Sequence, residues 1–200
     1  MCGIAGLIHK GKTVNIGKEL QDMLQALKHR GPDSTGYALY GEGSGDDNYI
    51  MRFKVGENVK EGSKAVNEDK SVYDSRRKQV DGHIRDLGAN IIQDQQLTPY
   101  SFRYVIKYDK DLMEFSKKVE SVEMTEILSL GKTLELVKDI GDANAVSKQY
   151  GLYKIKGTHA IGHSRMATES GVDIRSAHPF WGYPFSDVSV VHNGQLTNYW

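Results

Sequence analysis

The chain has 200 residues, and its 26 basic side chains balance its 26 acidic ones, so it carries no formal net charge at pH 7. This length suits a single domain, or one domain with a sizeable insertion, and is enough to bury a real core. The balanced charge argues against a nucleic-acid-binding face, and neither a membrane-spanning run nor a secretory leader is recognisable, so we expect a cytoplasmic protein.

The first part of the chain, up to about residue 56, predicts a strand, a helix and a hairpin. Gly3 to Ile8 is an apolar run of strand length, and residues 16–29 carry apolar side chains at helical spacing behind Asn15, a suitable N-cap. The sequence HRGPD ends this helix, since glycine and proline continue a helix only at a cost. Two runs, 36–40 and 49–55, flank the turn-rich GEGSGDDN and are expected to pair as a hairpin.

Residues 57–155 predict an α/β insertion that contains no chemical motif. Residues 59–73 are polar and are expected to form a loop, and residues 80–91 carry apolar side chains at helical steps. A strand is expected over 99–108. Three helices should follow it, over 112–119, 133–140 and 143–150. The many charged side chains of this segment are expected to face solvent.

The last part of the chain returns to apolar strands and glycine-rich corners. Strands are expected over 158–163 and 188–192. The sequence stops at LTNYW, where Thr197 could cap a further helix. We therefore expect a C-terminal part of the domain to be missing.

Cys2 is the single cysteine, so no internal disulfide can form, and the absence of an HExxH run leads us to expect no metal site. An initiator methionine before a small residue is commonly removed, which would leave Cys2 with both a thiol and an α-amine. A thiol titrates near ~8.5 and an α-amine near ~7.7, so the amine can take the thiol proton. From MCG alone, a small residue at a chain start is the simpler interpretation.

Two further motifs place polar groups at the ends of expected strands. In HRGPDSTG, Gly31 permits a tight backbone, Asp33 can bond neighbouring amides and Arg30 can meet a carboxylate. In HSRMAT, Arg165 could bind a ligand carboxylate in the bidentate manner, and Thr168 could add a hydroxyl. Each motif alone is explained at least as well by an ordinary turn or a strand-end salt bridge.

The apolar run before His192 ends in an Asn–Gly corner, and such corners are usually turns. The alternative is an oxyanion hole, in which the Asn193 side-chain amide and the Gly194 N–H meet a developing negative oxygen. One such donor can stabilise a transition state by about 3 kcal/mol. For this segment alone, the turn is the simpler interpretation.

Taken together and in this order, MCGIAGL, HRGPDSTG, HSRMAT, SAHPF and VVHNGQLTNY resemble the class II glutamine amidotransferases, which are N-terminal nucleophile hydrolases. The resemblance covers residues 2–56 and 156–200, about half of the chain. It implies an α+β fold, a four-layer αββα sandwich with the nucleophile at the start of the first strand. Residues 1–200 would form this domain, with 57–155 as its insertion.

The resemblance also implies roles for individual residues. Cys2 matches the nucleophile, and Asn193 with Gly194 matches the oxyanion hole. Arg165 matches the residue that holds the α-carboxylate of glutamine. The remaining matches are two substrate-contacting positions and a segment that supports the nucleophile: Thr168 and His178, then Arg30, Gly31 and Asp33.

The implied reaction is hydrolysis of glutamine to glutamate and ammonia through a γ-glutamyl thioester, with no metal or cofactor in this chain. Ammonia would pass to a synthase subunit or domain. Met166 and Glu169 stand where sugar-phosphate amidotransferases usually have Trp and His, and the insertion is long. The chain looks most like the stand-alone glutaminase subunits related to glutamate synthase, including those of N-methylglutamate synthase. In that group the acceptor site lies on a separate FMN-containing polypeptide.

Three alternatives stay open on the sequence. The chain could be the glutaminase half of an asparagine synthetase or of a phosphoribosyl or sugar amidotransferase. It could be another N-terminal nucleophile hydrolase, acting on amides such as penicillins or bile salts, although Arg165 followed by HNG favours glutamine. It could also be an inactive glutaminase-like regulatory or assembly subunit, which an unprocessed Met1 would favour.

Overall fold

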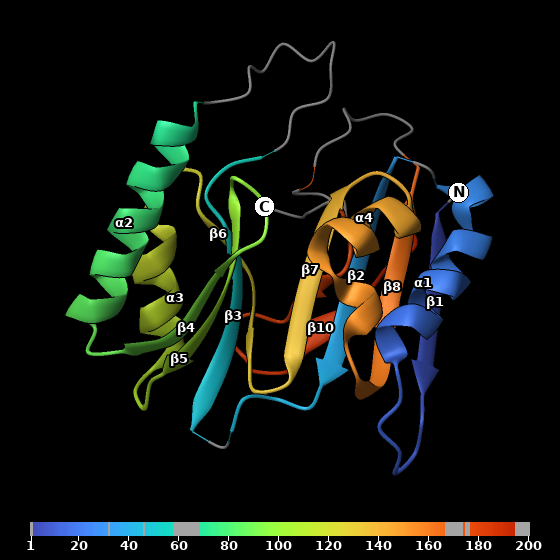
Figure 1. Ribbon diagram of the computed structural model, residues 1–200, viewed down its shortest axis with the longest axis horizontal. Helices are drawn as coiled ribbons and strands as arrows, with labels where there is room; N and C mark the ends of the chain where they lie inside the picture. Colours follow the sequence, from blue (N-terminus) through green and yellow to red (C-terminus); the bar gives the residue numbers. More distant parts are fainter. Residues whose placement is uncertain are drawn as a thin grey trace.

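The computed structural model describes residues 2–31, 33–45, 47–57, 69–166, 174 and 177–194. In this part of the chain the strands form two four-stranded sheets and one two-stranded sheet, and every strand pair is antiparallel. Helices cover the larger sheets (Figure 1). The prediction of an α+β fold is therefore confirmed. None of the helices in the described ranges has the length and apolar character needed to cross a membrane.

Sheet A has the strand order β1-β8-β2-β7. Its strands are β1 (Gly3–Ile8), β8 (Gly157–Arg165), β2 (Ser34–Gly41) and β7 (Leu134–Ile140). One face is covered by α1 (Ile16–Ala26), which the 3₁₀ turn η1 (Lys28–Arg30) follows, and by α4 (Ala143–Tyr150) with η2 (Leu152–Lys154). The helices bury their apolar stripes there: Leu20, Leu24, Val146 and Tyr150.

Sheet B has the strand order β4-β5-β3-β6. Its strands are β4 (Asn90–Gln96), β5 (Ser101–Lys107), β3 (Asn48–Lys54) and β6 (Glu126–Gly131). Two helices pack on one face, α2 (Lys70–Asp86) and α3 (Leu112–Glu120). The core between them is largely aromatic and includes Phe53, Phe102, Tyr104 and Phe115.

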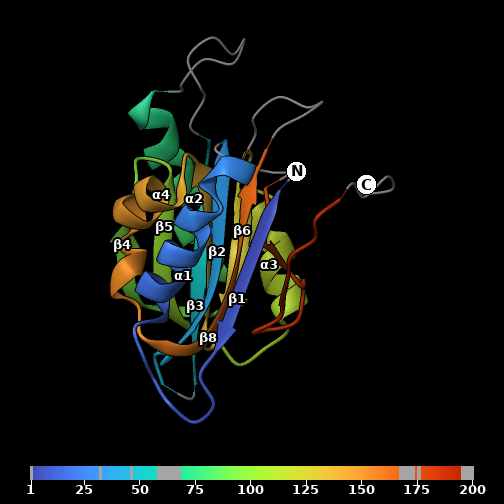
Figure 2. The ribbon, with the colours of Figure 1, turned by 90° about the vertical axis from the view of Figure 1, so that its right-hand side faces the viewer.

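The two sheets meet where β7 lies against β6 and β3. Glu135 on β7 is buried there between two arginines of sheet B, with its Oε2 at 2.7 Å from Arg52 Nε and 2.8 Å from Arg103 Nε. Seen from the side, α1 and α4 lie on one side of the strands and α3 on the other (Figure 2). Residues 57–155 thus supply strands to both sheets, and their interpretation as an insertion stays a prediction.

Two expectations about this part of the chain are wrong. The runs around GEGSGDDN do not pair as a hairpin, because β2 pairs with β7 and β8, whereas β3 pairs with β5 and β6. Residues 133–140 form the strand β7 and not a helix. Leu136 packs in one apolar cluster and Val137 packs beneath α4 in another, so both faces of this strand are buried. A strand buried on both faces gives no alternating pattern that would identify it.

Most other elements match the sequence prediction, with shifted ends. Asn15 caps α1, its side chain accepting from Lys18 N–H at 3.0 Å. The strand at 99–108 and the helices at 112–119 and 143–150 are confirmed as β5, α3 and α4. The helix expected over 80–91 ends earlier, and Ile91 belongs to β4; residues 70–73, expected in a loop, begin α2. Strand β6 was not predicted. Residues 58–68 and Thr197 lie outside the described residues.

A short hairpin crosses sheet A on the face that α1 and α4 leave uncovered. It consists of β9 (Phe180–Trp181) and β10 (Ser189–Val190), so the strand expected over 188–192 is shorter than predicted. The Asp187 carboxylate fixes it to the β6–β7 turn by accepting from the backbone N–H groups of Lys132, Thr133 and Leu134 at 3.0, 2.7 and 2.8 Å. Although burial opposes ionisation, these hydrogen bonds hold the pKa of Asp187 below its ordinary value.

Candidate active site

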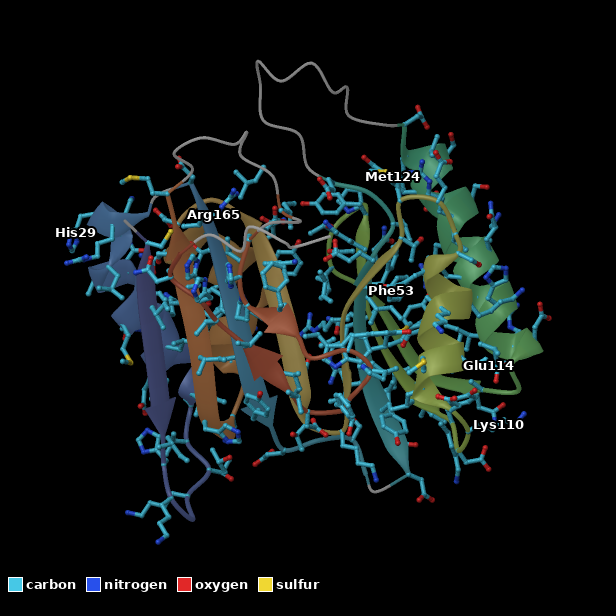
Figure 3. All side chains as sticks on the ribbon, turned by 180° about the vertical axis from the view of Figure 1, so that it is seen from behind. His29, Phe53, Lys110, Glu114, Met124 and Arg165 are labelled. Carbon is cyan, nitrogen blue, oxygen red and sulfur yellow. The ribbon has the colours of Figure 1, made fainter. Side chains whose placement is uncertain are left out.

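The candidate site lies at one end of sheet A, where β8 ends between the starts of β1 and β2. Gly3 pairs with Ser164, and Ser34 pairs with Arg165. Cys2 immediately precedes Gly3, so the register places it beside Arg165. Figure 3 shows Arg165 at the end of β8, within this end of the sheet. The side chain is 8% exposed, so its charge lies in a largely enclosed position.

The segment after α1 fits against the end of β8 through its backbone. A Cβ atom on Gly31 would lie 2.5 Å from both the Arg165 carbonyl carbon and the Ser164 oxygen, so this position requires glycine. Asp33 donates its backbone N–H to the Arg165 oxygen at 3.2 Å, and its own oxygen accepts from Gly141 N–H at 3.0 Å. Gly31 and Asp33 therefore support Arg165. The Arg30 side chain is exposed.

The HNG segment reaches the start of β1 across the sheet. The Asn193 side-chain Nδ2 donates to the Cys2 backbone oxygen at 3.2 Å. A Cβ atom on Gly194 would lie 2.5 Å from the exposed His192 ring, so the His192 side chain lies directly against this glycine. Cys2 is partly exposed. The structure thus brings Cys2 and Asn193 together although they are far apart in sequence.

His178 lies between the HNG segment and sheet A. Its Nδ1 accepts from the backbone N–H of His192 at 3.2 Å, and its ring packs against that of His163 with 4.9 Å between centroids. Burial lowers the pKa of His178 to about 4, and the neighbouring His163 and Lys138 contribute. This histidine is therefore neutral at pH 7, and its ring proton lies on Nε2 because Nδ1 is an acceptor.

His163 is a residue of this region that sequence reasoning did not single out. It is 1% exposed, and burial, together with the charge of Arg165, lowers its pKa to about 4. The available signal was its position two residues before Arg165 on the same strand, which puts both side chains on one face of the sheet. Thr168, the other predicted substrate contact, lies outside the described residues, as does Glu169.

Comparison with known proteins gives one consistent result. No protein-family model matches the chain. A protein of Methanothermobacter thermautotrophicus named "Putative glutamine amidotransferase" is 36% identical over 204 residues, covering 100% of this chain and 63% of the relative. The "Glutamine amidotransferase-like protein GlxB" of Rhizobium meliloti is 30% identical over 204 residues, covering 100% of this chain and 60% of the relative.

A shorter match points the same way. The chloroplastic amidophosphoribosyltransferase 2 of Arabidopsis thaliana is 36% identical over 73 residues, which is 36% of this chain and 13% of that protein. The chain spans less than two thirds of the length of the two relatives that match it throughout. Over its whole length the chain is related to the glutamine amidotransferases, and the resemblance to their class II members that its motifs indicated is confirmed.

Proposed function

We propose that the protein is a glutaminase that hydrolyses glutamine to glutamate and ammonia through a thioester on Cys2. The observation that carries this proposal is the 3.2 Å hydrogen bond from Asn193 Nδ2 to the Cys2 oxygen. It brings an amide donor to the residue whose thiol would attack, and Arg165 lies beside the same residue in the sheet register. Glutamine offers groups for both, a carboxamide for Cys2 and an α-carboxylate for Arg165.

Arg165 would orient the substrate. Its guanidinium can bind the α-carboxylate through two parallel hydrogen bonds, which fixes direction as well as position. The backbone contacts of Gly31 and Asp33 hold the end of β8 in place, so the arginine is presented from a rigid strand end. The predicted contacts of Thr168 and His178 with substrate remain part of the proposal, and Arg30 would support the region from its exposed position.

Removal of Met1 would give Cys2 an α-amine that can act as its base. The thiolate attacks the γ-carboxamide carbon, a C–S bond forms, and the oxygen gains the negative charge. The Asn193 amide would turn from the Cys2 carbonyl to this oxygen, together with Gly194 N–H. The C–N bond then breaks, and ammonia leaves with the proton that the amine took up. Water cleaves the thioester and releases glutamate.

We further infer that the ammonia passes to a synthase subunit or domain, of the glutamate-synthase kind with FMN on the partner polypeptide, and that this chain needs no cofactor of its own. The four-layer αββα sandwich belongs to the same proposal; the packing of α2 and α3 on sheet B and of α1 and α4 on sheet A is consistent with it (Figure 1). The inactive regulatory subunit is the less favoured alternative, because Cys2, Asn193 and Arg165 are all retained and two of them are in contact.

The test is glutamate release from glutamine, with asparagine as the shorter comparison substrate. Asn193→Ala should lower kcat by about 10²–10³-fold if its amide binds the oxyanion. Arg165→Lys should mainly raise KM, because lysine cannot form the two-pronged contact. Asn90→Ala, on an exposed strand of sheet B, serves as the control and should change neither value. A kcat of the Asn193→Ala variant equal to that of the unmodified protein would contradict the assignment of Asn193 to the oxyanion hole.

A further inference from the structure

His163 combines complete burial with unused hydrogen-bonding groups. It is 1% exposed, and neither ring nitrogen has a hydrogen-bond partner among the described residues. Leaving a buried polar group without a partner costs about 1–3 kcal/mol. A residue of this kind requires an explanation, because an apolar ring of the same shape would avoid that cost. What His163 does contact is the ring of His178.

The backbone around His163 is shaped to receive His178. Gly36 is the cross-strand neighbour of His163 on β2. A Cβ atom on Gly36 would lie 1.9 Å from the His178 oxygen, so the chain at His178 rests directly on β2. The His163 ring beside this notch meets the His178 ring at a tilt of 36°. Gly36 therefore allows the backbone at His178 to lie directly on β2, and the His163 ring packs against the side of the His178 ring.

The contacts of His178 lead on to the candidate nucleophile. The backbone N–H of His192 donates to His178 Nδ1 at 3.2 Å, and the next residue, Asn193, donates to the Cys2 oxygen at 3.2 Å. The N-terminal part of this segment is held at two other points. Asp187 accepts hydrogen bonds from the β6–β7 turn, and Ser189 forms a 2.8 Å hydrogen bond with Tyr40. Of the three points at which the segment is held, the one at His192, which His178 binds, lies nearest in sequence to Asn193.

We propose that His163 is a positioning residue that acts through His178 to hold Asn193 over Cys2. The inference rests on the proposed roles of Cys2 and Asn193. It assigns the effect to the shape of the ring and not to its nitrogens, because in the described part of the chain the ring packs on His178 while neither nitrogen is hydrogen-bonded. Without the His163 ring, the His178 ring could rotate. The hydrogen bond from His192 would then weaken, and the Asn193 amide would lose its alignment.

The experiment compares two substitutions at His163 with a matched control on the same strand. His163→Ala removes the ring, and His163→Phe keeps a ring without nitrogens. His159→Ala is the control, because His159 also lies on β8 and stacks on Tyr40, with 4.0 Å between ring centroids and 15° between planes. Rates are expressed per molecule that the glutamine analogue 6-diazo-5-oxo-norleucine labels, which excludes misfolded protein from the comparison.

We expect His163→Ala to lower kcat by about 10–100-fold with KM changed less than about threefold, because misalignment of a reacting group is costly while Arg165 still binds substrate. His163→Phe should stay within about threefold of the unmodified protein in kcat, since the contact survives. His159→Ala should leave kcat unchanged. An unaltered kcat in His163→Ala would overturn the proposal, and so would an equal loss in His163→Phe and His163→Ala.

A second measurement does not depend on activity. Imidazole ¹⁵N NMR should show His178 of the unmodified protein with its proton on Nε2 and Nδ1 as an acceptor. His163→Ala should mix the two tautomers, and His163→Phe should not. An unchanged His178 spectrum in His163→Ala would contradict the positioning role. If the unmodified protein neither forms an adduct nor hydrolyses glutamine, the proposed function fails, whereas the NMR result still decides whether His163 orients His178.

Discussion

Sheet A and sheet B are packed by opposite means. In sheet A and the helical layer that covers it, backbone lies directly on backbone at glycines. A Cβ atom on Gly17 would lie 1.8 Å from the Leu152 oxygen, and one on Gly157 would lie 2.0 Å from the Tyr40 oxygen. In sheet B, aromatic rings fill the space between strands and helices. The ring of Phe53 lies 5.2 Å from that of Phe102 and 4.9 Å from that of Tyr104, centroid to centroid.

This difference explains why one sheet carries recognisable motifs and the other does not. A backbone contact admits only glycine, so HRGPDSTG is fixed by geometry at Gly31 and Gly36. An aromatic core accepts many combinations of apolar side chains of similar volume. Sheet B therefore has a well-filled core without a sequence signature. The four predictions that follow test this contrast, with the largest expected effect first.

Replacing the candidate nucleophile should separate chemistry from packing most sharply. Cys2→Ala should lower glutamate release by at least about 10³-fold, since the loss of a nucleophile removes the covalent route altogether. The free energy of unfolding should change by less than about 0.5 kcal/mol, because Cys2 is partly exposed and lies outside the packed strands. Urea unfolding and the glutaminase assay measure both quantities. Substantial residual activity would show that another residue attacks.

The junction between the two sheets, where Glu135 of β7 meets arginines of sheet B, should respond in stability and not in chemistry. Glu135→Gln removes the charge that the buried Arg52 and the partly buried Arg103 share, and the loss of one partner from a buried ion network costs about 3–5 kcal/mol. The glutaminase rate per folded molecule should stay unchanged. Glu114→Gln is the control, because Glu114 is exposed on α3 (Figure 3), and urea unfolding should distinguish the two. Equal stability of both variants would argue against a stabilising role for the network.

Acid should weaken the candidate-site end of sheet A and the junction between the sheets in different pH ranges. The folded-state pKa of His163 is lowered by burial from 6.5 to about 4, so the unfolded chain binds the proton first as pH falls. Stability is therefore complete above pH 6.5 and declines towards pH 4, by up to on the order of 3 kcal/mol for this group. Burial alone would raise the pKa of Glu135, but Arg52 and Arg103 lower it from 4.5 to about 2. The stability that this carboxylate contributes is therefore present above pH 4.5 and is lost as the pH falls towards 2.

The measurement is the free energy of unfolding as a function of pH. His163→Phe should reduce the slope of the curve between pH 6.5 and 4, with the remaining slope due to His178, whose pKa is also lowered to about 4, and should leave the lower part of the curve in place. A curve that keeps its full slope in this variant would show that His163 is not buried in the neutral form.

A pair of glycine substitutions gives the smallest expected effects and the cleanest contrast. Gly31→Ala places a methyl group 2.5 Å from the backbone at Arg165, which should cost about 1–3 kcal/mol and raise KM by moving the arginine. Gly82→Ala in α2 meets nothing within 4 Å and should add up to about 1 kcal/mol, because alanine favours helix. Thermal unfolding checks both. A destabilising Gly82→Ala would weaken the distinction between the sheets.

The sequence was informative where local chemistry dictates structure. Asn15 and the apolar spacing after it predicted α1, and the motif order indicated the strand-end site that contains Cys2 and Arg165. Residues 133–140 were predicted as a helix, wrongly, because both faces of β7 are buried. The polar edge strand β4, NIIQDQQ, gave no strand signal because its side chains are mostly exposed. Asp187 and His163 act through partners that only the folded chain brings near, so neither formed a motif.

The central claim is that Cys2, released from Met1, attacks glutamine. The most direct test is intact mass before and after treatment with 6-diazo-5-oxo-norleucine, followed by peptide mapping. The account predicts loss of Met1 and one covalent adduct on Cys2, which excess glutamine should prevent. A chain that retains Met1 and forms no adduct would contradict the account and favour an inactive, glutaminase-like subunit.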